Sequence, residues 1–346
     1  MATHKVRFLP VDIEIEANED ETVLNAAFRQ GIALTHGCRE GQCAACKSFL
    51  LDGDIEMDKY STFALPERES EEGYVLLCRS HAYSDLEIEL INYDEDIIRL
   101  GTPIETFKTT IAAIETLTHD IRRLVLKFSE PDRSLTFAAG QYVSIQVPGG
   151  IVERAYSMAN TPRTKDQLEF MIKIFPGGVF SGLLDGGFTI GQELEVKGPY
   201  GVFMLHEKAD ADIICIGGGS GMAPLWSLLN DMAERGINRK ATYFYGARTT
   251  KDLFYLDRLQ QLEQQLPGFR FIPALSMATA EDAWNGETGL ITEVLDRHLD
   301  GDQTRTQAYL CGPPPMIDAA IPVLISKGIS EDRIFFDKFT PTGTAE

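Results

Sequence analysis

The sequence predicts three domains in a row: a small mixed α+β module, an antiparallel β-barrel, and a doubly wound parallel sheet with helices on both faces. The first observation is length, because 346 residues exceed what one ordinary hydrophobic core accommodates. The second is the apolar pattern, which changes near residue 212 from short strands to strands that alternate with helices. The third is the stretch 92–103, whose acids, glycine, proline and weak periodicity are typical of a linker.

The small module occupies residues 1–95. A helix is expected at 21–30, where Asp20 can act as the N-terminal cap and Gly31 ends the apolar stripe. Strands are expected around this helix at 6–8, 13–15 and 86–90, with apolar and acidic residues alternating in the last two. One helix and a few short strands of this kind favour a compact α+β fold.

The rest of the chain divides into a β-rich part at 104–206 and an alternating part at 207–346. The β-rich part has strand-like runs at fairly regular intervals, at 109–115, 121–128, 141–147, 153–158, 168–174 and 193–197. The alternating part has strand-like runs at 213–216, 241–245, 271–275, 308–311 and 334–336, with helical patterns between them. The first pattern predicts an antiparallel barrel, and the second predicts a doubly wound parallel sheet.

Composition argues against two kinds of partner. The formal net charge of −20 is unfavourable for nucleic-acid binding, because phosphate contacts need clustered lysines and arginines. No apolar run is long enough to span a membrane, and the polar N-terminus lacks the features of a signal peptide. We therefore expect the protein in the cytoplasm, without membrane or nucleic-acid partners.

The negative charge is unevenly distributed along the chain. Residues 1–100 contain 21 acidic residues against nine basic ones. One interpretation is a solvated surface that maintains solubility. The other is a docking surface that attracts a basic partner protein, and the sequence leaves both open.

Four cysteines have the spacing of an iron–sulfur site. Cys38, Cys43 and Cys46 form a C-x4-C-x2-C motif, and Cys78 follows alone. This spacing holds a [2Fe–2S] cluster through four thiolates. The alternative is zinc, but zinc sites more often use two C-x2-C pairs or one such pair with two histidines.

With these motifs the N-terminal part resembles the plant-type ferredoxins, which have a β-grasp fold. The remainder resembles the flavin- and nicotinamide-binding half of the ferredoxin reductases. Cys-Arg-Glu-Gly at 38–41, Tyr-Val-Leu-Leu-Cys-Arg at 74–79 and Lys-Phe-Thr-Pro at 338–341 are most similar to NADH-dependent reductases of bacterial soluble di-iron monooxygenases that act on small hydrocarbons.

The resemblance implies a domain and a cofactor for each part of the chain. A [2Fe–2S] ferredoxin domain would occupy 1–95, an FAD-binding β-barrel 104–206, and an NAD-binding α/β domain 207–346. NADH would give a hydride to FAD, and single electrons would pass through the cluster to the oxygenase component, the protein partner. This transfer would make the chain an electron-transport oxidoreductase.

A second motif lies on a strand of the expected barrel. Arg154, Tyr156 and Ser157 match the R-x-Y-S signature of the reductase family. Arg154 offers a fork of donors to a pyrophosphate, Tyr156 an aromatic face to the flavin, and Ser157 a hydroxyl to the flavin N5 edge. We therefore expect all three to bind FAD, with Ser157 also at the reacting centre.

A third motif follows at the start of a helix. Gly178 and Ser181 resemble the G-x-x-S turn at which the family binds the FAD diphosphate. Lys173, just before this turn, is expected near the same phosphates or the adenine.

A glycine-rich loop follows the first buried strand of the alternating part. It contains Gly217, Gly218, Gly219 and Gly221, and it opens a helix. Glycines at such a place let the backbone approach a diphosphate and point helical N–H groups at its charge. The alternative is a plain tight turn, but the letters also match the family's own Gly-Gly-Gly-Ser-Gly-Met-Ala-Pro.

Two C-terminal motifs are expected beside the nicotinamide and the flavin. Cys311 and Gly312 end the fourth strand, at the carboxyl edge where parallel sheets bind ligands. The resemblance places Cys311 at the hydride-transfer site, whereas by itself it could be a buried thiol. The resemblance also implies that Asp337 and Phe339 lie next to the flavin, although many relatives have Glu instead of Asp.

The choice of nicotinamide nucleotide is ambiguous from the residues alone. An acid after the second strand would favour the ribose of NADH, and clustered arginines would favour the phosphate of NADPH. Arg248 has no basic neighbour before Lys251. The resemblance implies NADH.

Three other functions remain as alternatives. The chain could be the reductase of a ring-hydroxylating dioxygenase, which shares every cofactor motif. It could also be an iron–sulfur sensor with a vestigial flavin region, or a reductase that releases free flavin. The intact flavin and glycine motifs disfavour the sensor, and the four cluster cysteines disfavour the free-flavin reductase.

Overall fold

The computed structural model describes all residues except 1, 96, 100, 151, 208–209 and 341–346. The chain forms two compact units, which are described separately. The first comprises Met1–Glu105 and Gly198–Val202, and the second comprises Thr106–Lys197 and Phe203–Glu346. Within the described residues, no helix is both long and apolar enough to cross a membrane.

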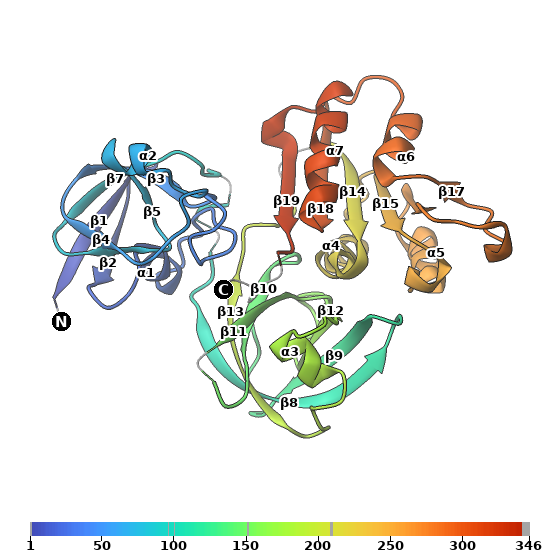
Figure 1. Cartoon of the computed structure of the whole chain (residues 1–346), viewed down its shortest axis with the longest axis horizontal. Helices are drawn as coiled ribbons and strands as arrows, with labels where there is room; N and C mark the ends of the chain where they lie inside the picture. Colours follow the sequence, from blue (N-terminus) through green and yellow to red (C-terminus); the bar gives the residue numbers. More distant parts are fainter. Residues whose placement is uncertain (1, 96, 100, 151, 208–209, 341–346) are drawn as a thin grey trace. The chain divides into compact units, whose positions relative to one another are not determined.

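The first unit contains a five-stranded mixed sheet with a helix packed on it (Figure 1). The strand order is β2 (Ile13–Asn18), β1 (Thr3–Leu9), β7 (Leu86–Leu90), β3 (Lys47–Asp52) and β5 (Tyr74–Leu76). The remaining elements are α1 (Val23–Arg29), α2 (Glu67–Glu71) and the pair β4 (Ile55–Met57) and β6 (Ser80–Ala82). β1 is parallel to β7 and antiparallel to β2, which is the β-grasp arrangement expected from the sequence.

The first helix begins later than predicted and has a different cap. Thr22, not Asp20, caps α1, since its hydroxyl accepts a hydrogen bond from the Asn25 N–H at 3.3 Å. Glu21 cannot join the helix in the predicted way because its carboxylate binds the Asn18 backbone and Arg29. A hydroxyl cap of this kind contributes about 1 kcal/mol to helix stability.

The stretch predicted as a linker packs against the first unit. Ile97 and Ile98 are buried, and the Ile98 carbonyl accepts a hydrogen bond from the Ala33 N–H at 2.9 Å. The acidic residues of this stretch suggested that it is exposed to solvent. Burial of the two isoleucines stabilises the packed conformation more than hydration of the acids would stabilise an exposed one.

An antiparallel sheet forms the barrel, most of which belongs to the second unit. Its order is β11 (Glu153–Ser157), β10 (Tyr142–Gln146), β13 (Glu193–Tyr200), β8 (Glu105–Thr116), β9 (Ile121–Phe128) and β12 (Gln167–Lys173). A bridge between Met158 and Phe170 joins the two edge strands and closes the barrel. The short helix α3 (Val179–Leu184) adds Phe180 and Leu184 to its core.

The second unit also contains a six-stranded parallel sheet (Figure 1). Its order is β17 (Glu287–Thr288), β16 (Phe269–Leu275), β15 (Ala241–Ala247), β14 (Asp212–Gly218), β18 (Thr306–Gly312) and β19 (Ile334–Lys338). The helices are α4 (Met222–Arg235), α5 (Leu256–Gln265), α6 (Ile291–His298) and α7 (Pro314–Ser326). The order reverses between β14 and β18, which is where doubly wound sheets bind their ligands.

One hydrophobic core joins the barrel to the parallel sheet. Met171 and Phe203 of the barrel pack in the same cluster as Leu225 of α4 and Tyr309 of β18. A buried hydrogen bond from the Ser227 hydroxyl to the Asn160 carbonyl, 2.7 Å long, reinforces this contact. The barrel and the sheet therefore form a single compact body.

Candidate functional site

The four predicted cluster ligands converge in the loop between α1 and β3 and just after β5. A hydrogen bond with Cys43 lowers the pKa of Cys38, and one with Cys78 lowers the pKa of Cys46. The same two bonds raise the pKa values of their partners, Cys43 and Cys78. The thiols therefore lie within hydrogen-bonding distance in two pairs, as a common ligand set requires.

The backbone around these thiols is shaped to hold a cluster. The N–H groups of Cys38 and Gln42 point at Cys43 Sγ and Cys38 Sγ, at 3.2 and 3.1 Å. A Cβ atom on Gly37 would come 2.9 Å from Cys43 Sγ, so a side chain there would displace a ligand. N–H groups aimed at sulfur are the hydrogen bonds that tune an iron–sulfur cluster, and the loop therefore fits the group.

Burial of the four ligands is asymmetric. Cys46 and Cys78 are buried, whereas Cys43 is exposed and Cys38 is partly exposed. One edge of a cluster held here would therefore lie at the surface, where a partner could approach it.

The flavin motif lies on β11, and the ring of its Tyr156 packs against α3. The Tyr156 ring centroid is 4.9 Å from that of Phe180, and burial raises the pKa of the Tyr156 hydroxyl. Arg154 lies two residues earlier on the same strand, at the register position of Ile145. Gly178 precedes α3, and the Ser181 hydroxyl accepts a hydrogen bond from the Phe175 N–H at 3.2 Å.

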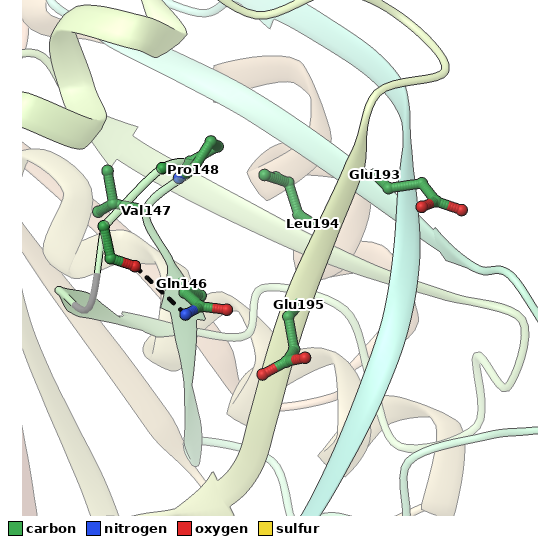
Figure 2. Close-up of a pocket in the computed structure, with 8 residues that line it drawn as sticks. Gln146, Val147, Pro148, Glu193, Leu194 and Glu195 are labelled. Carbon is green, nitrogen blue, oxygen red and sulfur yellow. Dashed lines mark hydrogen bonds between the residues drawn. The ribbon is translucent and has the colours of Figure 1, made fainter.

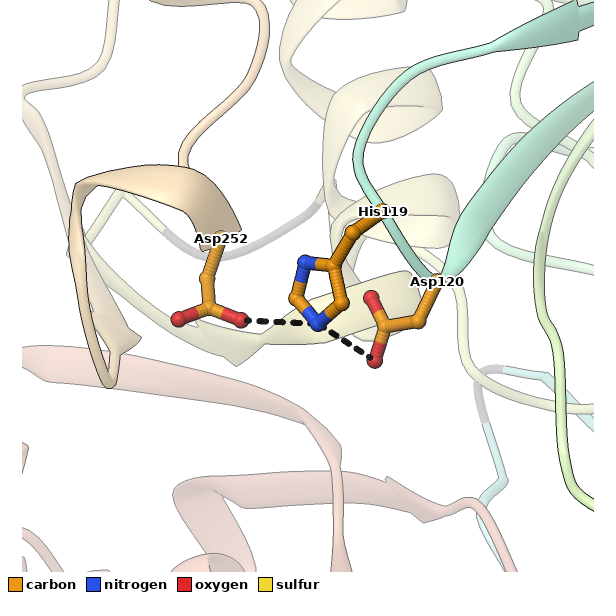
Figure 3. Close-up of side chains that lie close together, drawn as sticks. All are labelled: His119, Asp120 and Asp252. Carbon is orange, nitrogen blue, oxygen red and sulfur yellow. Dashed lines mark ion pairs between the residues drawn. The ribbon is translucent and has the colours of Figure 1, made fainter.

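Lys173 forms an ion pair that the sequence did not indicate. Its ammonium forms a 2.8 Å ion pair with Asp120, in the turn between β8 and β9. His119 Nε2 lies 3.8 Å from Asp120 and 3.9 Å from Asp252, which belongs to the parallel-sheet part (Figure 3). Lys173 and His119 both pair with Asp120, and His119 also pairs with Asp252. These four side chains therefore form a connected set of ion pairs within the second unit. A contact between Lys173 and FAD phosphates stays a prediction.

The four residues predicted at the reacting centre come together. The Ser157 side chain lies close enough to the Asp337 carboxylate to lower its pKa. Asp337 is the β19 neighbour of Cys311, and the Phe339 N–H donates to the Gly312 carbonyl at 2.9 Å. Sequence positions almost two hundred residues apart therefore meet at one point on the carboxyl edge of the sheet.

Asp337 and Cys311 differ in their protonation. Asp337 retains some surface exposure, yet the dense packing around its carboxylate raises its pKa to about 6. Burial raises the pKa of the Cys311 thiol, which keeps it neutral. The site therefore contains one group that titrates near neutral pH and one that does not.

The glycine loop joins β14 to α4. A Cβ atom on Gly221 would collide with the Cys311 carbonyl, and one on Gly217 would come 2.6 Å from the Tyr243 hydroxyl. Gly219 has φ +57°, and a Cβ atom there would have no neighbour within 4 Å, so the outer side of the loop is open. Strand–helix packing therefore requires Gly217 and Gly221, and the open side of the loop is free to receive a diphosphate.

Arg248 is exposed at the carboxyl end of β15. Thr249 and Asp252 close the turn after it, since the Asp252 carboxylate accepts hydrogen bonds from the Thr249 N–H and hydroxyl. The sequence missed a further acid, Asp282, which hydrogen-bonds Thr250 from a loop 32 residues away. The only local signal was a second Thr-x-x-Asp pattern.

A cavity of about 430 Å³ lies elsewhere on the barrel (Figure 2). It is formed by residues 146–150 and by Glu193, Leu194 and Glu195, and none of the predicted cofactor-binding residues lines it. The hydrogen bond from Gln146 Nε2 to the Gly150 carbonyl closes a turn at its edge. The chemistry predicted from the motifs therefore does not involve this cavity.

This fold and these sites define an electron-transfer reductase with an iron–sulfur module, a flavin barrel and a nucleotide-binding sheet. Three family models match the chain in that order. They are the 2Fe-2S iron-sulfur cluster binding domain at 6–83, the oxidoreductase FAD-binding domain at 108–205 and the oxidoreductase NAD-binding domain at 215–321. The [2Fe–2S], FAD and NAD predictions are confirmed, and zinc is excluded as the interpretation of the cysteines.

The chain is similar to named proteins over nearly its whole length. It is 50% identical to the propane 2-monooxygenase reductase component of Mycolicibacterium goodii, covering 98% of this chain and 97% of that protein. It is 36% identical to a phenol 2-monooxygenase reductase component of Pseudomonas sp. (strain CF600), covering 97% and 94%. The crystal structure of an Amycolatopsis cytochrome P450 reductase superposes with a TM-score of 0.87 at 30% identity, covering 99% and 100%.

The chain therefore belongs to the reductase components of multicomponent oxygenases. It is an NADH-dependent oxidoreductase that delivers electrons to an oxygenase component, as the sequence predicted.

Proposed function

We propose that this chain is the reductase of a soluble di-iron monooxygenase that acts on small hydrocarbons such as propane. Sequence identity supports the small-hydrocarbon class, because it is 50% to a propane monooxygenase reductase and 36% to a phenol monooxygenase reductase. We assign the cluster, flavin and nucleotide to residues 1–95, 104–206 and 207–346. The activity belongs to the cytoplasm, where NADH is available.

The observation that carries the catalytic part of this proposal is the meeting of Ser157, Cys311, Asp337 and Phe339. When bound, FAD accepts a hydride from NADH, and the [2Fe–2S] cluster accepts and passes on single electrons. The side chains named here would orient these groups rather than react themselves.

Each residue has a proposed task. Arg154 would hold the FAD pyrophosphate through its guanidinium, and Tyr156, braced by Phe180, would support the flavin ring. Gly178 and Ser181 would bring backbone N–H groups to the same phosphates. Arg248 would lie at the ribose end of NADH, and Gly217, Gly218, Gly219 and Gly221 would receive its diphosphate.

Asp337 would hold a proton at the reacting centre. With a pKa of about 6, its carboxyl group can exchange a proton with the Ser157 hydroxyl near neutral pH. Cys311 and Gly312 would form the wall beside the nicotinamide, where the neutral thiol leaves the charge of the ring undisturbed. Phe339, fixed by its hydrogen bond to Gly312, would exclude water.

The oxygenase component would dock on the acidic face of the first unit, formed by Glu67, Glu69, Glu71 and Glu72 on and after α2. None of the residues of α2 is buried. Glu69 pairs with Lys47 and Glu72 with Arg68, so Glu67 and Glu71 are the acids that offer their charge to a partner. Phe63, just before α2, is 96% exposed, an unusual position for a large aromatic side chain. An apolar ring beside a group of acids matches a partner surface with basic residues around an apolar centre.

Charge-neutral variants test this docking face. Glu67→Gln, Glu71→Gln and Glu72→Gln together should slow reduction of the oxygenase component at low salt and leave dye reduction by NADH unchanged. The matched control is Glu14→Gln, Glu16→Gln and Glu89→Gln, three exposed acids on β2 and β7. Equal rates for both triple variants with the oxygenase component would reject docking at α2.

An anaerobic titration with NADH tests the electron path. Absorbance should show flavin bleaching, and EPR of frozen samples should show a rhombic [2Fe–2S] signal from the same additions. An oxidised cluster beside a bleached flavin would contradict the proposed path. Turnover with isolated propane monooxygenase hydroxylase, but not with a ring-hydroxylating dioxygenase, would support the hydrocarbon class, and the reverse preference would overturn it.

A further inference from the structure

The fold supplies an acid at the place where the sequence lacks one. In doubly wound sheets, the residues after the second strand face the adenosine ribose of the bound nucleotide. Here the second strand is β15, and the segment 246–251 at its end contains the basic residues Arg248 and Lys251 and no acid. Discrimination between NADH and NADPH therefore needs a group from elsewhere.

Asp282 lies where a group that discriminates NADH from NADPH is needed. It lies in the turn Ala280–Asp282, in the loop that follows β16, the strand next to β15. Asp282 Oδ1 accepts a 3.0 Å hydrogen bond from the Thr250 hydroxyl, so the carboxylate stands against the segment that ends β15. Asp252, which also follows β15, is turned toward Thr249 and His119 instead.

The hydrogen bonds of Asp282 keep it charged and fix its direction. Oδ2 accepts from the Thr279 N–H at 2.7 Å and from the Thr279 hydroxyl at 2.9 Å. The bond from the Thr279 backbone, helped by the two threonine hydroxyls and the nearby charge of Lys251, lowers the pKa of Asp282. A carboxylate has about four acceptor sites, and three are occupied, which leaves one on Oδ1 beside Thr250.

We propose that Asp282 makes this reductase selective for NADH. Its free acceptor site on Oδ1 can take a hydrogen bond from a ribose hydroxyl. A 2′-phosphate has no such donor under neutral conditions and carries a charge of about −1.5 to −2, so the same carboxylate repels NADPH.

The inference rests on the proposed nucleotide site at the glycine loop. Its test is equilibrium binding of NAD⁺ and of NADP⁺ to the oxidised holoprotein, measured by calorimetry. The quantity compared is the ratio of the two dissociation constants, because a general loss of structure changes both. Binding of neither nucleotide to the wild type would refute the proposed site itself.

Asp282→Asn removes the charge and keeps a carbonyl oxygen toward Thr250. This variant should reduce the NADP⁺/NAD⁺ ratio of dissociation constants about three- to tenfold at low salt, mainly by tighter NADP⁺ binding. The effect should shrink as the salt concentration is raised, because an exposed charge is screened over about 10 Å at 0.1 M. A structural role in the turn would not produce this salt dependence.

Two further variants complete the test. Asp302→Asn is the matched control, because Asp302 is also an exposed acid that accepts a hydrogen bond from a threonine N–H in a turn, that of Thr304. It should leave the ratio unchanged. Asp282→Glu retains the charge and should keep the preference for NAD⁺. A ratio in Asp282→Asn within twofold of the wild type at low salt, with NAD⁺ still bound, would overturn the assignment.

Discussion

Replacement of Asp337 by asparagine should stabilise the second unit, and more so as the pH rises. The pKa of Asp337 is about 6, against an ordinary value of 3.8, because burial disfavours its charge. An acid with a raised pKa binds more protons in the folded than in the unfolded state between these two values. Stability is therefore lost as the pH rises from about 4 to about 6, and the loss then levels off.

The size of the effect follows from the shift in pKa. A difference of about two pKa units corresponds to about 3 kcal/mol when the carboxylate is fully ionised. Integration over pH gives about half of this cost at pH 5 and nearly all of it at pH 8. The Asp337→Asn variant has no such cost, although a weaker hydrogen bond to Ser157 takes back about 1 kcal/mol.

Flavin fluorescence during heating provides the assay, because FAD becomes fluorescent when the second unit unfolds and releases it. For a body of this size, 1 kcal/mol changes Tm by about 2–4 °C. The Tm advantage of Asp337→Asn over the wild type should therefore be about 3–6 °C larger at pH 8 than at pH 5. Asp332→Asn, a change at a neighbouring exposed acid, should show no such trend. A difference that does not change with pH would refute the burial argument.

Three further predictions concern the cluster loop, the glycine loop and the first helix. Gly37→Ala should lower the iron content and the [2Fe–2S] absorbance of the purified protein, because its Cβ would press on Cys43 Sγ; Gly182→Ala, which has open space around it, should not. Gly221→Ala should weaken NAD⁺ binding at least tenfold in calorimetry, because its Cβ collides with the Cys311 carbonyl. Thr22→Ala should destabilise the first unit by about 1 kcal/mol in urea unfolding, through loss of the α1 cap; no change in the midpoint would assign the capping to another group.

Features set by neighbouring residues were predictable from the sequence. The cluster ligands occupy one short loop plus Cys78, so their spacing alone indicates their chemistry. The glycine loop follows a buried strand and opens a helix, and this order along the chain is enough to place it at the carboxyl edge of the sheet. Both predictions needed only local geometry.

Features that depend on side-chain competition or on distant contacts were not predictable in this way. Asp20 and Thr22 are both good caps, and the choice depends on Glu21, whose carboxylate binds Arg29. Ser157 and Asp337 belong to different domains, and the sequence predicted each of them near the flavin but not their pairing. The repeated Thr-x-x-Asp pattern did not indicate that Thr250 pairs with Asp282, because two adjacent parallel strands bring them together.

The division of the chain into two units matches the two kinds of transfer that the family performs. A hydride moves only between atoms held almost in contact, so the groups that orient donor and acceptor must belong to one rigid body. Here Ser157 comes from the barrel and Asp337 from the sheet, and the shared core with its Ser227–Asn160 hydrogen bond fixes them to each other. An electron does not need such contact, and the cluster ligands accordingly lie in a separate compact unit. Loosening the shared core should therefore impair hydride transfer before it affects the cluster.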